Sequence, residues 1–172
     1  RVERDSGGSA RFVTAVYFDE TDRRRAADAL AEKAQELETV LDAVPAAIWR
    51  TRDEDAARID GNAFSRRLLR IEGAANMSLT APETERPTGF HVRNMAGRRL
   101  EPEELPVQRA ARGEEVRDFE EEIVFDDGRS IFLAGNARPL FDAAGNRQGA
   151  VAAFIDITAR REAEELMRAS EA

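Results

Sequence analysis

The stretch that decides the fold is Ile155-Asp156-Ile157-Thr158-Ala159-Arg160-Arg161, which joins an apolar run to a charged, Ala-rich one. The Thr hydroxyl can accept a hydrogen bond from an N–H of a new helix, and the Asp carboxylate favours the positive helix start. A related phrase, Phe18-Asp19-Glu20-Thr21-Asp22-Arg23-Arg24, follows another strand-like run. This repetition predicts that one domain ends near Thr21 and a second domain of the same type near Thr158.

Outward from this junction, the preceding residues predict three consecutive antiparallel strands. Residues 116–125 alternate, with Phe119, Ile123 and Phe125 on one face. Asp126-Asp127-Gly128 predicts a hairpin turn into a strand over residues 129–140. The last strand, 149–157, is nearly all apolar, and a helix is expected from position 158 to the end.

The middle of the chain predicts short elements. Strands are expected over residues 46–50, 57–60 and 90–93. One helix should begin at Asn62, and another should span residues 102–111. Strands, then helices, then three strands predict an α+β domain with its helices on one face of the sheet.

A heptad pattern runs through residues 22–44. Two columns of apolar residues, each with a spacing of seven, form a seam made of Ala27, Leu30, Ala34, Leu37, Leu41 and Val44. The narrow stripe on a polar helix predicts a dimeric coiled coil, and the alternative is an amphipathic helix packed on its own domain. Pro45 should end the helix, because proline disfavours helical geometry at the residue before it.

Composition limits the function classes. The net charge is −8, which argues against nucleic acid as the main partner. No run of about 18 apolar residues occurs, so no membrane span is expected here. The absence of cysteine excludes disulfides, thiolate catalysis and iron–sulfur clusters, and it fits the cytoplasmic location that we expect. The first residue is Arg, so we expect a piece of a longer protein.

No catalytic or metal-binding pattern stands out. The acidic pairs Glu103-Glu104 and Asp126-Asp127 are explained by a helix start and a hairpin turn. Phosphate loops, nucleophile elbows and metal-ligand spacings do not occur. We therefore expect neither a metal nor catalysis in this segment.

Several short motifs, taken together in this order, resemble a PAS domain over about residues 37–165. They are Val44-Pro45-Ala46-Ala47-Ile48-Trp49, Asn62-Ala63, Glu103-Glu104-Leu105-Pro106 through Gly113, Asn136-Ala137-Arg138-Pro139-Leu140, Asp142-x-x-Gly145-x-x-x-Gly149, and Asp156-Ile157-Thr158. Residues 78–113 look like the PAS subfamily of bacterial sensor histidine kinases.

The resemblance implies a PAS-like sheet of five antiparallel strands that cups a small cavity, flanked by a coiled-coil-type helix and a C-terminal signalling helix. It divides the chain into residues 1–21, a remnant of an upstream PAS domain whose last strand lies at 11–18, and 22–44, a linker helix. Residues 45–158 would be the PAS domain, and 159–172 the start of an output linker helix.

The same resemblance suggests site residues. Signal transmission is assigned to Asp156 and Thr158 and, in the first copy, to Asp19 and Thr21; the alternative is a simple helix cap. Arg160 or Arg161 could pair with Asp156. The residues expected to line a pocket are Ile48, Phe64, Leu68, Leu105, Ile123, Leu133, Gly135, Ala137, Ala152 and Phe154. The alternative is a filled core, since Asn136 is the one polar candidate.

Haem and flavin are not expected as cofactors. By the resemblance, a haem ligand would sit on a helix facing the cavity, whereas His91, the only histidine, precedes the helix at 102–111. A covalent flavin adduct needs a cysteine, which the chain lacks. We expect His91 to be an ordinary surface or partly buried residue.

The resemblance implies a sensory and dimerisation module of a bacterial signal-transduction protein, and we expect a two-component sensor histidine kinase with its phosphorelay domains after Ala172. The homodimer would form through helix 22–44 and the C-terminal helix. The alternative is a cofactor- or metabolite-binding PAS receptor coupled to another output, such as a diguanylate cyclase.

Overall fold

The computed structural model describes residues 2–4, 7, 10–13, 20–73 and 75–171. The chain divides into two compact units, Arg1–Glu38 and Thr39–Ala172. In the first, β1 (Val2–Arg4) and β2 (Ala10–Val13) pair antiparallel, with Glu3 opposite Phe12. The predicted strand over residues 11–18 is thus present up to Val13, while Asp19 and the rest of that strand lie outside the described residues. The assignment of residues 1–21 to an upstream PAS domain stays a prediction.

Helix α1 (Thr21–Ala43) begins and ends one residue before the predicted helix. Thr21 is its first residue. Val44, the last position of the proposed seam, lies just past the helix end because Pro45 follows it. None of the helix's residues, all of which the structure describes, is buried, and the side chains of Leu30 and Leu37 are 73% and 63% exposed.

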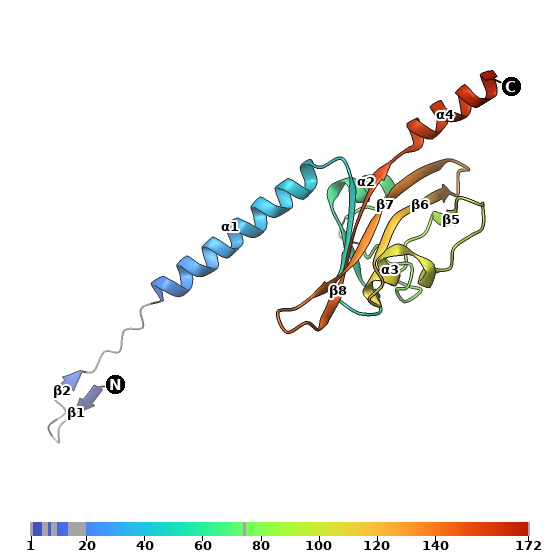
Figure 1. The fold of residues 1–172 in the computed structure, drawn as a ribbon. Helices are drawn as coiled ribbons and strands as arrows, with labels where there is room; N and C mark the ends of the chain where they lie inside the picture. The colour runs from blue at the N-terminus through green and yellow to red at the C-terminus, as the bar shows by residue number, and fades with distance from the viewer. Residues whose placement is uncertain (1, 5–6, 8–9, 14–19, 74, 172) are drawn as a thin grey trace. The chain divides into compact units, whose positions relative to one another are not determined.

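The second unit is built on one antiparallel sheet of six strands, in the order β4-β3-β8-β7-β6-β5 (Figure 1). The strand bounds are β3 Ala47–Thr51, β4 Ile59–Gly61, β5 Phe90–Asn94, β6 Val116–Phe125, β7 Ser130–Phe141 and β8 Arg147–Asp156. The predicted α+β class is confirmed. The sheet has one strand more than the resemblance implied, because β5 pairs with β6 and places Val92 opposite Ile123.

Two helices, α2 (Ala63–Leu69) and α3 (Pro106–Ala111), cover one face of this sheet. That face carries the core: Trp49, Leu133 and Phe154 are buried, and the rings of Trp49 and Phe154 lie 5.7 Å apart. On the other face, alternate residues such as Ile155 are exposed. The period-2 alternation of the strands therefore divides an apolar interior from an outer surface.

Asn62 shows why α2 begins where the sequence predicts. Its Oδ1 accepts hydrogen bonds from the N–H of Ser65 (3.0 Å) and of Ile48 (3.1 Å), so it caps α2 and holds β3. Its Nδ2 donates to the carbonyls of Ala46 (3.0 Å) and Leu41 (2.8 Å). One amide thus ties the helix start to β3 and to the last turn of α1.

The helix predicted over residues 102–111 is two elements. A 3₁₀ turn, η1 (Pro102–Glu104), precedes α3, and Leu105 between them has an extended backbone with φ −71° and ψ 148°. The break is caused by Pro106, which disfavours helical geometry at the residue before it. The break places Leu105, the N-cap residue of α3, at the pocket described below.

The hairpin prediction at Asp126-Asp127-Gly128 is confirmed. The N–H of Gly128 donates to the carbonyl of Phe125 at 2.9 Å, and Gly128 has a φ of +82°, a conformation that glycine adopts without strain. β7 then returns beside β6, and β8 pairs with both β7 and β3. Helix α4 (Thr158–Glu171) follows β8 directly, as predicted.

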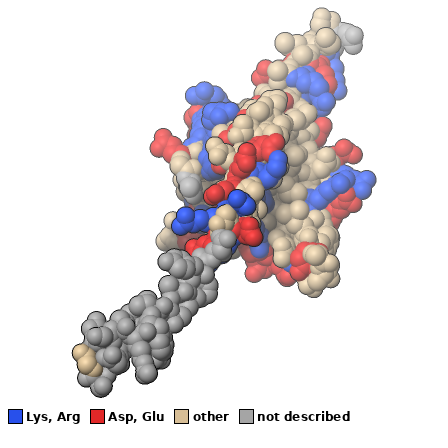
Figure 2. All heavy atoms as spheres, turned by 90° about the vertical axis from the view of Figure 1, so that its left-hand side faces the viewer, with Lys and Arg blue, Asp and Glu red and all other residues tan. Residues whose placement is uncertain are grey.

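Surface charge is mixed on the face shown in Figure 2, where Lys and Arg lie among Asp and Glu with no large area of one sign. Among the described helices, none combines the length and apolarity needed to cross a membrane.

Candidate functional site

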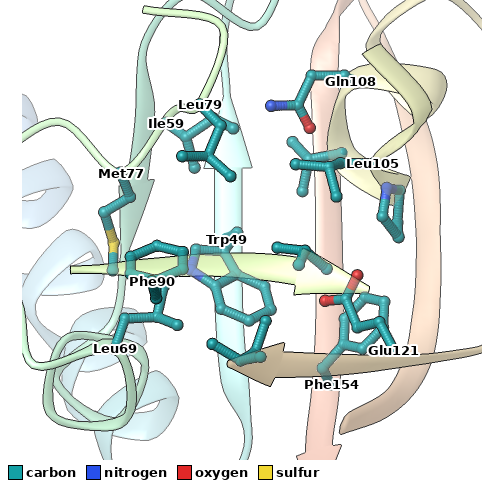
Figure 3. A pocket seen from close by; sticks show the side chains of 14 residues that line it. Trp49, Ile59, Leu69, Met77, Leu79, Phe90, Leu105, Gln108, Glu121 and Phe154 are labelled. Atoms are coloured by element: carbon teal, nitrogen blue, oxygen red, sulfur yellow. The ribbon is translucent and has the colours of Figure 1, made fainter. Parts of the chain in front are cut away.

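A pocket of about 60 Å³ lies between the sheet and the helices that cover it (Figure 3). Its walls are mostly aliphatic and aromatic. They are formed by Trp49, Ile59, Leu69, Met77, Leu79, Phe90, Val92, Leu105, Pro106, Val107, Gln108, Glu121, Ile123 and Phe154. The sheet contributes one wall, and α3 with the residue before it contributes another.

Two polar side chains face this apolar pocket, Gln108 from α3 and Glu121 from β6. They are only 2% and 5% exposed, respectively. Figure 3 shows both on the same side as Leu105, with Met77 and Phe90 across the pocket and Trp49 between. Oε2 of Glu121 has no hydrogen-bond partner among the described residues.

Burial raises the pKa of the Glu121 carboxyl from its ordinary 4.5 to about 8, because the charged form loses its hydration. No other titratable side chain that the structure describes lines the pocket. At neutral pH Glu121 is therefore an uncharged acid, with one O–H donor and one carbonyl acceptor.

The predicted lining residues fall into separate groups. Leu105, Ile123 and Phe154 line the pocket. The others do not: Leu133, Ala137 and Ala152 are buried in the core, and Phe64 and Leu68 are partly buried against it.

Ile48 and Gly135 do not line the pocket, for two different reasons. β3 buries Ala47, Trp49 and Thr51, so Ile48 belongs to the opposite face and Trp49 takes the expected place. Gly135 lies beneath Phe154, and a Cβ at this position would come within 2.7 Å of Cγ of that ring. Phe154 therefore occupies the space beside Gly135.

Asn136 does not supply the polar group of the pocket. It is exposed, and its Oδ1 accepts a hydrogen bond from the N–H of Asp118 (2.8 Å). Asp118 has a φ of +49° at an irregularity between Val116 and Phe119, so Asn136 supports a bulge in β6.

The start of α4 is tied to β7. The Thr158 hydroxyl accepts a hydrogen bond from the N–H of Phe132 at 2.9 Å, and the N–H of Ile157 donates to the Phe132 carbonyl at 2.8 Å. Oδ1 of Asp156 accepts from the N–H of Thr158 at 2.9 Å. The Thr158 hydroxyl was expected to cap its own helix; it bonds to a neighbouring strand instead, and Asp156 takes the first helical N–H.

Two arginines of the first helical turn reach β6. Arg160 and Arg161 lie 3.6 Å and 3.3 Å from the carboxylate oxygens of Glu120. The Arg161 guanidinium also lies over the Phe132 ring, 5.0 Å from its centroid. The expected ion pair with Asp156 on β8 is therefore replaced by a pair with Glu120 on β6, two strands away.

Glu120 and Glu121 are consecutive residues on β6 with opposite orientations. Glu121 faces the pocket, whereas Glu120 pairs with α4 outside it. A strand presents successive side chains to opposite faces, so one short segment of β6 contacts both the pocket and the exit helix.

The family follows from a comparison with known sequences. A sequence model described as the PAS fold matches residues 41–162. The chain belongs to the PAS family. A comparison of this PAS domain with curated proteins gives no match.

Solved structures agree with this fold. The PAS domain of Bordetella pertussis BvgS superposes with a TM-score of 0.50 at 19% identity, covering 83% of this chain and 98% of that one. The PAS domain of an HTR-like protein from Haloarcula marismortui gives a TM-score of 0.46 at 20% identity, with coverages of 78% and 99%. A sensory box histidine kinase/response regulator from Burkholderia thailandensis gives 0.45 at 14% identity, with coverages of 79% and 95%.

His91 of the PAS domain lies on β5, half-buried, opposite Val124 and outside the pocket lining. Among the residues that the structure describes, no three His, Asp or Glu side chains gather in a way that could hold a metal ion. A PAS domain is a signalling module without catalysis of its own.

Sequence reasoning missed Glu121 and Gln108. The signal for Glu121 was present in the run Phe119-Glu120-Glu121-Glu122-Ile123. A strand alternates faces, so a run of successive glutamates must place at least one of them on the apolar face. For Gln108 the sequence offers no comparable signal, since a short helix tolerates a polar residue on any face.

Proposed function

We propose that this PAS domain is the sensory and dimerisation module of a bacterial two-component sensor histidine kinase, located in the cytoplasm. A change at the pocket or the sheet passes through Asp156-Ile157-Thr158 into α4 and from there to a kinase domain. The kinase assignment rests on the resemblance of residues 78–113 to the PAS domains of such kinases.

One observation carries the transmission step: the first turn of α4 is bonded to β6 and β7, not to β8 alone. The contacts are Thr158 with Phe132 (2.9 Å) and Arg161 with Glu120 (3.3 Å). A packed helix joined to a sheet by a few discrete bonds can switch between discrete arrangements, which suits a transmitter. Asp19 and Thr21 would play the same part for an upstream domain.

Dimerisation through α1 and α4 is part of this proposal. The seam residues are exposed in the single chain, with Leu41 of α1 at 38% and Val44, just past the helix end, at 40%. On α4, Leu166 and Met167 are 72% and 69% exposed. Apolar stripes on polar helices favour association with a second copy.

The test is the output of the intact protein that carries this chain. Thr158→Ala removes the hydroxyl bonded to Phe132, and we expect it to change basal autophosphorylation with ATP by about fivefold, the equivalent of one hydrogen bond. Thr84→Ala, at an exposed turn position, is the matched control and should leave the rate unchanged. An unaltered rate in Thr158→Ala would contradict the transmission role.

The second candidate is a metabolite receptor coupled to another output, such as a diguanylate cyclase. The buried polar pair Gln108 and Glu121 favours the receptor part of this alternative. Incubation of the intact protein with labelled ATP or with GTP separates the outputs. A phosphorylated protein supports the kinase, and a cyclic dinucleotide supports the cyclase.

Neither candidate includes haem or flavin. A pocket of about 60 Å³ supports this, because a cavity of about 150 Å³ binds benzene, a molecule far smaller than haem or flavin.

A further inference from the structure

We propose that the pocket binds a small uncharged molecule whose hydrogen-bond donor and acceptor lie side by side, such as a carboxamide or a lactam, and that Glu121 and Gln108 hold it. This inference names the ligand class of the sensory function proposed above and rests on that function for its signalling role. Binding itself can be tested separately.

One polar atom of the pocket lacks a protein partner. Oε2 of Glu121 has none among the described residues, and the side-chain amide of Gln108 lines the same side of the pocket (Figure 3). Buried polar groups in native proteins are nearly always paired, and an unpaired one costs free energy. A buried, unpaired carboxyl oxygen that faces a pocket indicates that a ligand or water supplies the missing partner.

The chemistry of the two groups favours a donor–acceptor ligand. A protonated carboxyl and a primary amide each offer one donor and one acceptor a short distance apart. A carboxamide or lactam offers the same pair in the complementary order. The apolar remainder of such a ligand would contact Trp49, Phe90 and Phe154.

Charged ligands fit less well. No Lys, Arg or His of the described part of the chain lines the pocket, so an anion would be buried against Glu121 without compensation. A cation would require the ionised form of Glu121, but burial keeps this carboxyl protonated at neutral pH, with a pKa of about 8. The volume of about 60 Å³ limits the ligand, or the part of it that enters, to a few non-hydrogen atoms.

Ligand binding at Glu121 should also affect the contacts of α4. On β7, Leu133 lies opposite Glu121. The next pair along these two strands is Glu120 on β6 opposite Ala134 on β7. Glu120 carries the ion pair with Arg161. A small shift of β6 on ligand binding therefore alters the contact that fixes the first turn of α4.

The test is an NMR titration of the 172-residue chain with four molecules of equal size: acetamide, acetone, acetate and acetamidinium. At a pH of about 6.5, where Glu121 is protonated, we expect saturable shifts of pocket amides and of the Trp49 indole N–H with acetamide. The other three, which lack the neutral donor–acceptor pair, should bind about tenfold more weakly.

Variants assign the binding to the two residues. Glu121→Leu and Gln108→Leu should each weaken acetamide binding about tenfold, whereas Glu121→Gln, which keeps a donor and an acceptor, should retain it. Glu122→Leu, from the adjacent outward position, is the matched control and should also retain it. If Glu121→Leu does not fold, the acetamide affinity of Gln108→Leu tests the proposed binding site.

The outcomes distinguish the two proposals. Equal or tighter binding of acetate or acetamidinium, unchanged binding in the Leu variants, or no saturable shift up to about 100 mM acetamide would overturn the ligand inference. Shifts in the pocket without any at Thr158 and Arg161 would uphold the ligand site and contradict transmission to α4.

Discussion

Glu121 places a carboxyl group in an apolar core, and its effect on stability depends on pH. Burial raises its pKa to about 8, whereas the unfolded chain has the ordinary value of 4.5. Below about pH 4.5 both states hold the proton, and the folded state bears no penalty. Between pH 4.5 and 8 the unfolded state ionises and the folded state does not, so stability falls as pH rises.

The first prediction concerns this window. The difference in unfolding free energy between Glu121→Gln and the wild type should grow by about 1.4 kcal/mol per pH unit between pH 5 and 8. Urea denaturation at a series of pH values measures it, with Glu122→Gln as a control whose difference stays flat. A constant difference for Glu121→Gln would show that the carboxyl ionises normally in the folded state.

Other carboxylates do not disturb this measurement. Hydrogen bonds from Arg98 lower the pKa of Glu104 to about 2, and those from Asn146 lower the pKa of Asp142. A lowered pKa contributes stability that is present above the ordinary value and is lost as pH falls below it. Their effects therefore appear below about pH 4.5, outside the window of Glu121.

At the residue scale, sequence rules predicted those features that depend on hydrogen bonds between residues close together in the chain. Asn62 was expected to begin a helix, and its side chain does cap α2. The orientation of Ile48 and the role of Thr158 could not be obtained in this way. The face of a short strand depends on its register with β8, and the hydroxyl partner of Thr158 lies on another strand, at Phe132.

At the scale of elements, α4 is anchored by its first turn alone. Arg161 is the most buried basic residue of this turn, with a side chain 28% exposed, and it contacts both Glu120 and the Phe132 ring. Residues 162–170 of the helix are exposed. The anchor is therefore a small set of contacts whose loss should loosen the helix without unfolding the sheet.

The second prediction follows from this anchor. Arg161→Ala should remove about 1 kcal/mol of ion-pair and cation–π stabilisation and raise hydrogen exchange of the first-turn amides of α4 about fivefold. Arg168→Ala, in the exposed last turn, should leave those amides unchanged. Equal exchange rates in the two variants would mean that Glu120 and Phe132 do not hold the helix.

Most elements, but not all of their pairings, could be predicted. The strands from 116 to 156 and their hairpins carry clear alternation and turn signals, and the structure has them close to the predicted bounds. The pairing of β5 with β6 and the break at Leu105 were missed. The sequence of a short strand does not indicate which strand it pairs with. The break before Pro106 was missed because the acidic residues before it predicted the start of one continuous helix.

At the scale of the whole molecule, the proposed dimerisation through α1 needs a test that leaves the fold intact. Removing residues 1–44 would be an ambiguous test, because the last turn of α1 also supports α2. The carbonyl of Leu41 accepts from Nδ2 of Asn62 (2.8 Å), and Oδ1 of Asp42 accepts from the N–H of Ala63 (2.8 Å). A truncated chain would lose these bonds together with the seam.

The last prediction therefore uses point substitutions within α1. Leu37→Asn changes a seam position, whereas Val40→Asn changes an apolar residue off the seam that is similarly exposed, at 55% against 63%. A buried seam position loses about 2 kcal/mol per protomer on such a change, enough to shift the dimer dissociation constant by more than an order of magnitude, and an exposed position loses little. Sedimentation equilibrium of both variants and the wild type measures the effect. If both variants associate like the wild type, or weaken equally, the heptad seam does not mediate the dimer.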